Sequence, residues 1–145
     1  MVGCFMHNRS RARAKAKADE ILSYLNLKDL SGYLVSELPV AAQKRVTMAT
    51  ALGTEPKLLL LDEVAAGLNP SEIEEILASI KHVHYDLGVT VMLIEHVMEL
   101  VMKISDRVIV LDSGQKIAEG KPEEIASNPA VIKAYLGERY VKEHG

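Results

Sequence analysis

The chain has 145 residues, of which 48% are hydrophobic and 26% charged, and its formal net charge is -3, which predicts one soluble globular domain with a sizeable core. The small net charge gives no argument for nucleic acid or an acidic membrane surface as a partner, and the single cysteine, Cys4, excludes an intrachain disulfide and a cysteine metal cluster. No apolar run approaches the roughly 20 residues of a membrane-spanning helix, and residues 1–6 are too short for a signal core, so any link to a membrane has to go through a partner.

The first element that the pattern predicts is a helix over residues 11–25, with an apolar stripe at helical spacing near its end. Its beginning is basic, and the cationic side chains alternate with small residues: Arg9, Arg11, Arg13, Lys15 and Lys17. This alternation favours a solvated helix face. The alternative, a nucleic-acid patch, lacks interleaved aromatic residues that could stack on bases.

Residues 27–33 are rich in turn formers and predict a loop with a short turn, and a second helix is expected over residues 40–52, before Gly53. Four consecutive leucines then occupy residues 58–61, after Pro56. A short apolar run bounded by turn signals is typical of a parallel strand, and we expect this strand to be buried on both faces.

Asn69-Pro70 predicts the start of the clearest helix, because Asn can cap it and Pro suits its first position. Gly88 ends this helix, and residues 89–94 form a second apolar strand. A strand, helix and strand of this length predict a parallel crossover.

The remaining elements are short. A helix is expected over residues 96–104, and strands are expected over residues 107–111 and 115–118, joined by a tight turn at Ser113-Gly114. Pro122 begins one further helix and Asn128-Pro129 another. Strands that alternate with helices in this way predict an α/β fold.

Polar side chains follow the two apolar strands directly. Asp62 and Glu63 come after the first strand, and His96 follows the second. Ligands of open α/β sheets bind at this edge. One carboxylate there can hold a magnesium ion through water, and the other can orient the water that attacks a phosphoryl group. The imidazole can donate a hydrogen bond to a phosphate. The alternative for Asp62 and Glu63 is that they merely begin a loop, and the alternative for His96 is a structural role. His82 and His84 are expected to be solvated, and no cluster has metal-ligand spacing.

Several motifs resemble those of ABC transporter ATPases, and they occur in the family's order. Residues 58–63 resemble the Walker B strand, residues 93–96 the switch-histidine motif and residues 107–120 the strand pair after it. Residues 66–70 resemble the D-loop of the branched-chain amino acid importers, and residues 134–138 resemble the ending of that subfamily.

The resemblance covers residues 11–138 and the C-terminal half of the family's domain. It implies a partial P-loop NTPase (ABC ATPase) fold with a mostly parallel sheet flanked by helices and part of the helical subdomain. Residues 1–52 would form the helical and signature region, residues 53–120 the core and residues 121–145 the C-terminal helices.

The resemblance also implies roles for individual residues. Asp62 would hold the magnesium shell through water, Glu63 would act as catalytic base, and His96 would contact the γ-phosphate of ATP. Asn69 would help to couple two chains in a head-to-tail dimer. The resemblance implies ATP hydrolysis for an importer of branched-chain amino acids, with ATP and Mg²⁺ as cofactors. The implied partners are a second ATPase subunit and membrane permease subunits on the cytoplasmic face of the membrane, with no nucleic acid.

Two departures from the family's pattern matter. The phosphate-binding run Gly-x-x-x-x-Gly-Lys-Ser/Thr does not occur in the 145 residues. The signature Leu-Ser-Gly-Gly-Gln falls on residues 38–42, which read Leu-Pro-Val-Ala-Ala, so the positions expected to face the nucleotide hold Pro39, Ala41 and the following Gln43. Pro39 has neither a hydroxyl nor an amide proton to offer a phosphate. Val64 stands where the family usually has Pro, which is a milder departure.

These departures lead to three expectations. The chain alone should have no meaningful ATPase activity and at best weak nucleotide affinity. Its leucine strand should invite pairing with another chain, because an uncovered apolar edge does so. The alternative functions are a degenerate fragment that acts only as an interaction module, which the altered signature favours, and a soluble ABC ATPase of DNA repair, which the importer-like ending disfavours.

Overall fold

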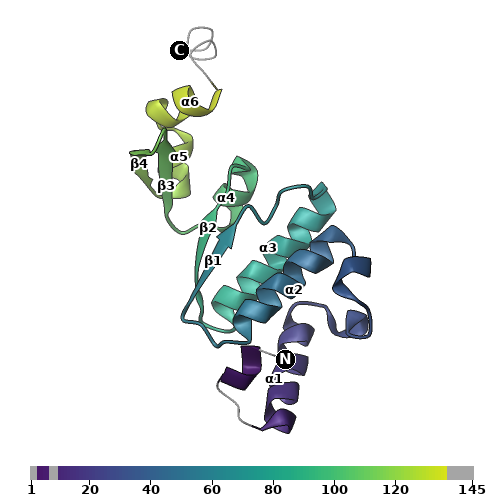
Figure 1. Ribbon diagram of the computed structural model, residues 1–145. Coiled ribbons are helices and arrows are strands. Elements are labelled where there is room, and N and C mark those ends of the chain that lie inside the picture. Colours follow the sequence, from purple (N-terminus) through teal and green to yellow (C-terminus); the bar gives the residue numbers. More distant parts are fainter. Residues whose placement is uncertain (1–2, 7–9, 137–145) are drawn as a thin grey trace. The chain divides into compact units, whose positions relative to one another are not determined.

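The computed structural model describes residues 3–6 and 10–136 (Figure 1). It consists of two compact units, Met1–His96 and Val97–Gly145. Arg9 of the basic stretch and the Gly137-Glu138 part of the predicted ending lie outside the described residues. The division into three functional regions, at residues 52 and 120, remains a prediction.

The first unit contains two strands and three α-helices, and short 3-10 turns lie before and between them. The α-helices and strands are α1 (Arg11–Tyr24), α2 (Val40–Leu52), β1 (Leu58–Asp62), α3 (Pro70–Tyr85) and β2 (Thr90–Ile94). The 3-10 turns are Gly3–Met6, Lys28–Leu30 and Val35–Glu37. The last two turns occupy part of the predicted loop and the segment before the signature, where runs of three residues are too short to show a periodic pattern.

Helix α3 is the element that organises this unit. Its apolar side chains recur at helical spacing and are almost completely buried: Ile76, Leu77, Ile80 and Val83. The helix lies beside α2 (Figure 1) and packs against β2. The same face that the sequence pattern predicts as apolar therefore forms the core of the unit.

Strands β1 and β2 are parallel, and their register runs from Leu58 opposite Thr90 to Asp62 opposite Ile94. Burial alternates along β1, because successive side chains point to opposite faces of the sheet. Leu59 and Leu61 are buried, whereas Leu58 is 50% and Leu60 65% exposed. The prediction that this strand is buried on both faces is therefore wrong for this chain.

The outer face of the sheet remains apolar. Met92 and Ile94 on β2 are also exposed, and the register places them opposite Leu60 and Asp62. Parallel strands are normally covered on both faces, and the described part of the first unit covers one. The four leucines of β1 are typical of a strand covered on both faces, and the described residues cover only one face.

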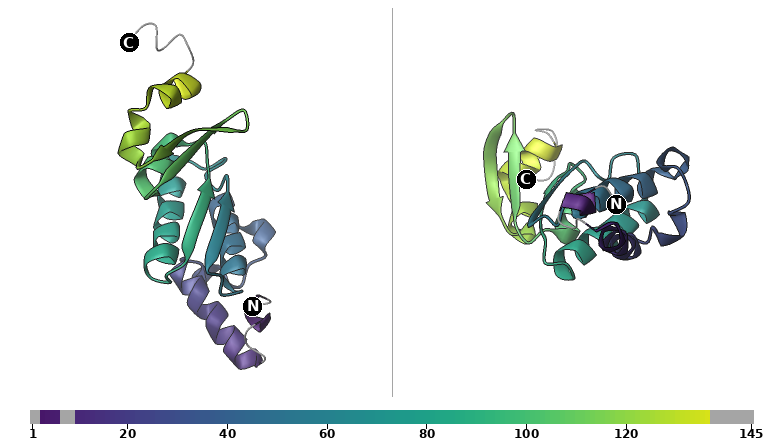
Figure 2. Two further views of the ribbon diagram at one scale, coloured as in Figure 1. Left: turned by 90° about the vertical axis from the view of Figure 1, so that its left-hand side faces the viewer. Right: turned by 60° about the horizontal axis from the view of Figure 1, so that its bottom comes forward.

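The second unit is built around an antiparallel hairpin, which is drawn in green in both views of Figure 2. Its elements are α4 (Met98–Ile104), β3 (Val108–Asp112), β4 (Gln115–Gly120), α5 (Pro122–Ala126) and α6 (Pro129–Leu136). Ser113 and Gly114 both have positive φ angles, 48° and 79°, as a tight two-residue hairpin turn requires. Val108, Ile125 and Val131 form the small core.

Candidate functional site

The parallel register brings the ends of β1 and β2 to the same edge of the sheet. Asp62 lies opposite Ile94, and the Glu63 amide donates to the Ile94 carbonyl at 2.9 Å. Beyond this bond, Nδ1 of His96 lies 3.8 Å from Oε1 of Glu63. Both side chains are exposed, and so is Asp62. The structure therefore brings two residues that are 33 positions apart into contact at one solvent-accessible edge.

The chain turns sharply directly after β1. Glu63 has a φ angle of 46°, in the left-handed region that a non-glycine residue rarely adopts. Its carbonyl accepts from the Ala66 amide at 3.2 Å and from Nζ of Lys44 at 3.1 Å. The amide of Ala65 donates to Oε1 of Glu95 at 2.7 Å. Contacts from α2 and from the end of β2 therefore hold the turn on which Glu63 lies.

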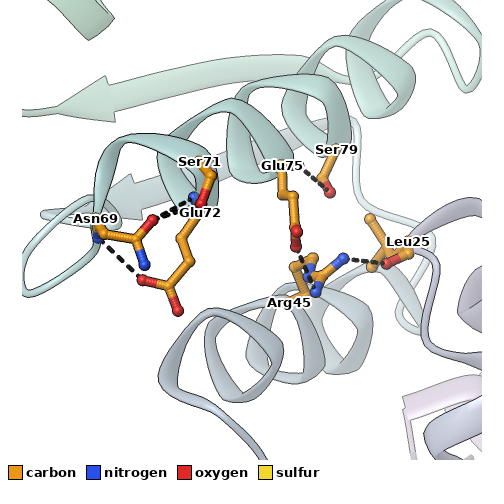
Figure 3. Close-up of polar contacts among 7 residues, drawn as sticks. All are labelled: Leu25, Arg45, Asn69, Ser71, Glu72, Glu75 and Ser79. Carbon is orange, nitrogen blue, oxygen red and sulfur yellow. Dashed lines mark hydrogen bonds and ion pairs between the residues drawn. The ribbon is translucent and has the colours of Figure 1, made fainter.

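The loop from Ala65 to Asn69 continues into α3 through a second turn. Gly67 adopts a φ angle of 77°, which suits a residue without a Cβ. Asn69 caps the helix: its Oδ1 accepts from the Glu72 amide at 3.0 Å and from the Ser71 hydroxyl at 2.7 Å, and Oε2 of Glu72 accepts from the Asn69 amide at 2.9 Å (Figure 3). This reciprocal capping box fixes the position of the Asn69 side chain.

The signature region begins α2 without a side-chain cap, and Pro39 is the cap residue. The Ala41 side chain is buried, and Nε2 of Gln43 donates to the Leu38 carbonyl at 2.8 Å. Val40 is half exposed at the start of the helix. The side chains of Ala41 and Gln43 are thus engaged with the chain itself, and Pro39 and Val40 present apolar groups to the solvent at this helix start.

The donor set at the sheet edge suits a magnesium ion that keeps most of its water. Mg²⁺ in nucleotide sites is held by one or two carboxylates together with waters and phosphate oxygens, and Asp62 offers one exposed carboxylate at the end of β1. Among the described residues, no group of three or more His, Cys, Asp or Glu side chains is arranged to hold a metal ion alone. Asp62 therefore fits the part of one carboxylate ligand in such a site.

Sequence reasoning missed two residues that position this site. Glu95 carried a signal, since it directly follows an apolar strand at the edge where ligands bind. Lys44 carried none, because its contact with Glu63 joins positions 19 apart in the sequence.

Comparison with known proteins gives consistent matches. The family model described as a branched-chain amino acid ATP-binding cassette transporter matches residues 115–141. The high-affinity branched-chain amino acid transport ATP-binding protein BraF of Pseudomonas aeruginosa is 44% identical over 130 residues, covering 90% of this chain and 51% of BraF. LivG of Escherichia coli is 41% identical over 133 residues, covering 90% of this chain and 51% of LivG.

Solved structures agree with this result. MJ1267, an ATP-binding cassette of an ABC transporter in its ADP conformation, is 32% identical with a TM-score of 0.78, covering 86% of this chain and 50% of MJ1267. A nucleotide-free ATP-binding cassette from an ABC transporter is 30% identical with a TM-score of 0.79, covering 90% of this chain and 53% of that protein.

The fold and the motifs at its sheet edge define part of an ATP-binding cassette, the α/β domain class of ABC transporters. Within this class, the chain is similar in sequence to the branched-chain amino acid transport ATP-binding proteins. It spans about half the length of the curated relatives that it matches. No helix in the described residues has the length and apolar character needed to cross a membrane.

Proposed function

We propose that this chain supplies the water-activating half of the ATP hydrolysis site of an ABC importer for branched-chain amino acids. Glu63 acts as the general base on the attacking water, and His96 donates a hydrogen bond to the terminal phosphate. The contact between Glu63 and His96 at 3.8 Å carries this proposal. A base and a phosphate donor on one edge are the arrangement that phosphoryl transfer to water requires.

Asp62 has a separate role in the proposal. Its carboxylate holds the water shell of a magnesium ion, which supplies charge neutralisation at the phosphate oxygens when it is bound. The phosphate-binding loop has to come from residues beyond the 145 of this sequence, because no such run occurs within them. We therefore expect ATP and Mg²⁺ to bind productively only when that loop is supplied.

The proposed partners follow from the family. A second ATPase subunit pairs head to tail with this one, and Asn69 lies in the loop that couples the two. The relatives BraF and LivG are transport ATP-binding proteins, which supports permease subunits as the membrane partners. The proposed location is the cytoplasmic face of the membrane, reached through the permease.

The test is reconstitution. The chain is co-expressed with the phosphate-binding half of BraF, and ATP hydrolysis by the purified complex is measured. We expect hydrolysis by the complex, none by the chain alone, and a loss of about 10²–10³-fold in Glu63→Gln and His96→Ala, the range seen when one preorganised active-site group is removed. His82→Ala is the matched control, because His82 pairs with Asp86 on α3, and it should leave the rate unchanged.

One observation favours a second candidate, a non-catalytic interaction module. Pro39 and Val40 replace the residues that would approach the partner's ATP, and Ala41 is buried. A stable complex with the BraF half that hydrolyses no ATP would support this module and contradict the catalytic proposal.

A further inference from the structure

The Glu63 turn is held in an unfavourable conformation, and its supports come from outside the turn. The φ angle of Glu63 is 46°, and residues in such regions persist where the surroundings over-determine them. The end of β2 and the residue after it provide two of these supports: the Ile94 carbonyl for the Glu63 amide and the Glu95 carboxylate for the Ala65 amide. The position of Glu63 therefore depends on the end of β2.

The Glu95 contact is the strongest of these supports on chemical grounds. At 2.7 Å it is shorter than the 2.9 Å bond from Glu63 to Ile94, and it joins a carboxylate to an amide, a class of hydrogen bond stronger than a neutral pair when the carboxylate is ionised. Ala65 is buried, so its amide would lose its partner without Glu95. An unpaired buried amide is costly and rare in native proteins.

Glu95 is adjacent in the chain to one of the two residues that the site brings together. It precedes His96, whose Nδ1 is 3.8 Å from Oε1 of Glu63. The Glu95 side chain thus links the turn that carries Glu63 to the segment that carries His96. Oε2 of Glu95 is buried and has no hydrogen-bond partner among the described residues, so a single bond accounts for the carboxylate's placement.

We propose that Glu95 is a positioning residue, which clamps the turn after β1 so that Glu63 and His96 face each other. This proposal rests on the proposed function only for the use of that pair in hydrolysis. The clamp itself is a property of the 145-residue chain and is measured without nucleotide.

The test compares Glu95→Ala with Glu95→Gln in the full chain. Glutamine keeps an oxygen acceptor for the Ala65 amide, whereas alanine has none. Hydrogen exchange with single-residue resolution should show faster exchange of the Ala65 amide by at least about tenfold in Glu95→Ala, which equals about 1.4 kcal/mol of opening free energy, and near-normal exchange in Glu95→Gln.

The second readout is the contact between the His96 ring and the Glu63 side chain, measured by nuclear Overhauser effects. This contact should be lost in Glu95→Ala, because the turn that carries Glu63 is released, and it should return in Glu95→Gln. A residue that only stabilised the fold would lower the unfolding midpoint and leave this contact in place.

Glu72→Ala is the matched control. It removes a hydrogen bond of the same kind, in which Oε2 of Glu72 accepts from the Asn69 amide at 2.9 Å. It should speed exchange at the Asn69 amide and leave both the Ala65 exchange and the Glu63–His96 contact unchanged. Equal exchange at Ala65 in the wild type and Glu95→Ala would overturn the proposal. Loss of the Glu63–His96 contact in Glu95→Ala, together with a wild-type reconstituted complex that hydrolyses no ATP, would refute the proposed function and leave the clamp standing.

Discussion

Arg45 on α2 joins three helices, and its removal should be the most destabilising polar change in the first unit. The residue is only 8% exposed. One guanidinium nitrogen lies 2.9 Å from Oε2 of Glu75 on α3, and another donates to the Leu25 carbonyl at the end of α1 at 3.4 Å (Figure 3). We predict that Arg45→Ala costs more stability than Glu75→Ala, although both break the same ion pair.

The magnitudes follow from burial. Arg45→Ala removes buried methylenes, worth about 0.8 kcal/mol each, and leaves the Leu25 carbonyl, in a fully buried residue, without its donor, which costs about 1–3 kcal/mol. The buried Nε of Arg45 already lacks a partner among the described residues, and losing that desolvated group offsets part of the cost. We expect a net loss of about 2–4 kcal/mol.

Glu75→Ala should cost about 1 kcal/mol or less. The Glu75 side chain is 53% exposed, so water screens its attraction to Arg45 and solvates the freed guanidinium edge. Arg45→Met should fall between the two alanine variants, because methionine restores most of the buried volume without the charge.

The assay is urea unfolding followed by circular dichroism at neutral pH, with Lys81→Ala on the exposed side of α3 as the control, expected within about 0.5 kcal/mol of wild type. If Glu75→Ala lowers the unfolding free energy as much as Arg45→Ala does, the loss comes from the ion pair and not from the buried guanidinium. The reasoning from burial is then refuted.

Four further predictions test other parts of the molecule. Asn69→Ala should lower the unfolding free energy by about 1 kcal/mol in the same assay, because it removes the cap of α3; an unchanged midpoint would contradict the capping role. Light scattering should find the wild-type chain associated and Leu60→Lys more monomeric, because Leu60 lies on the exposed apolar sheet face; a monodisperse wild-type monomer would count against this. Calorimetry should detect no saturable micromolar binding of ATP to the chain alone, and such binding would refute the expectation drawn from its sequence. A hydrogen bond from Lys116 and its charge lower the pKa of Glu119 below 4.5, so its stabilising contribution is present above that pH and is lost as the pH falls further; Glu119→Gln should flatten the dependence of the melting temperature on pH in that acidic window, and parallel curves would argue against it.

Most element boundaries could be predicted because strong local signals mark them. Asn69-Pro70 begins α3 as expected, Gly53 follows α2, and Ser113-Gly114 forms the hairpin turn. Each signal acts through its own backbone geometry, which depends little on distant residues. The strand pairing was predictable for the same reason, since a strand, a helix and a strand leave few topologies.

The burial of β1 and the shape of the site were not predictable in the same way. A run of leucines indicates a strand that needs cover, but it does not say whether the residues that provide it lie within the same 145 residues. The positive φ angle of Glu63 has no sequence signal, because glutamate has no preference for that region. The turn is contacted by Lys44 and Glu95, which are 19 and 32 positions away from Glu63.

The site therefore separates into a part that this chain builds and a part that it does not. The Glu63–His96 pair depends on the register of β1 and β2, on the bond from Glu63 to Ile94 and on the Glu95 contact, all of which lie within the first unit. The outer face of the same two strands, with Leu58, Leu60 and Met92 exposed, is the part that the described residues leave uncovered. Covering that face should stabilise the sheet without rearranging its edge, so under the proposed function a phosphate-binding half would meet a Glu63–His96 pair that is already formed.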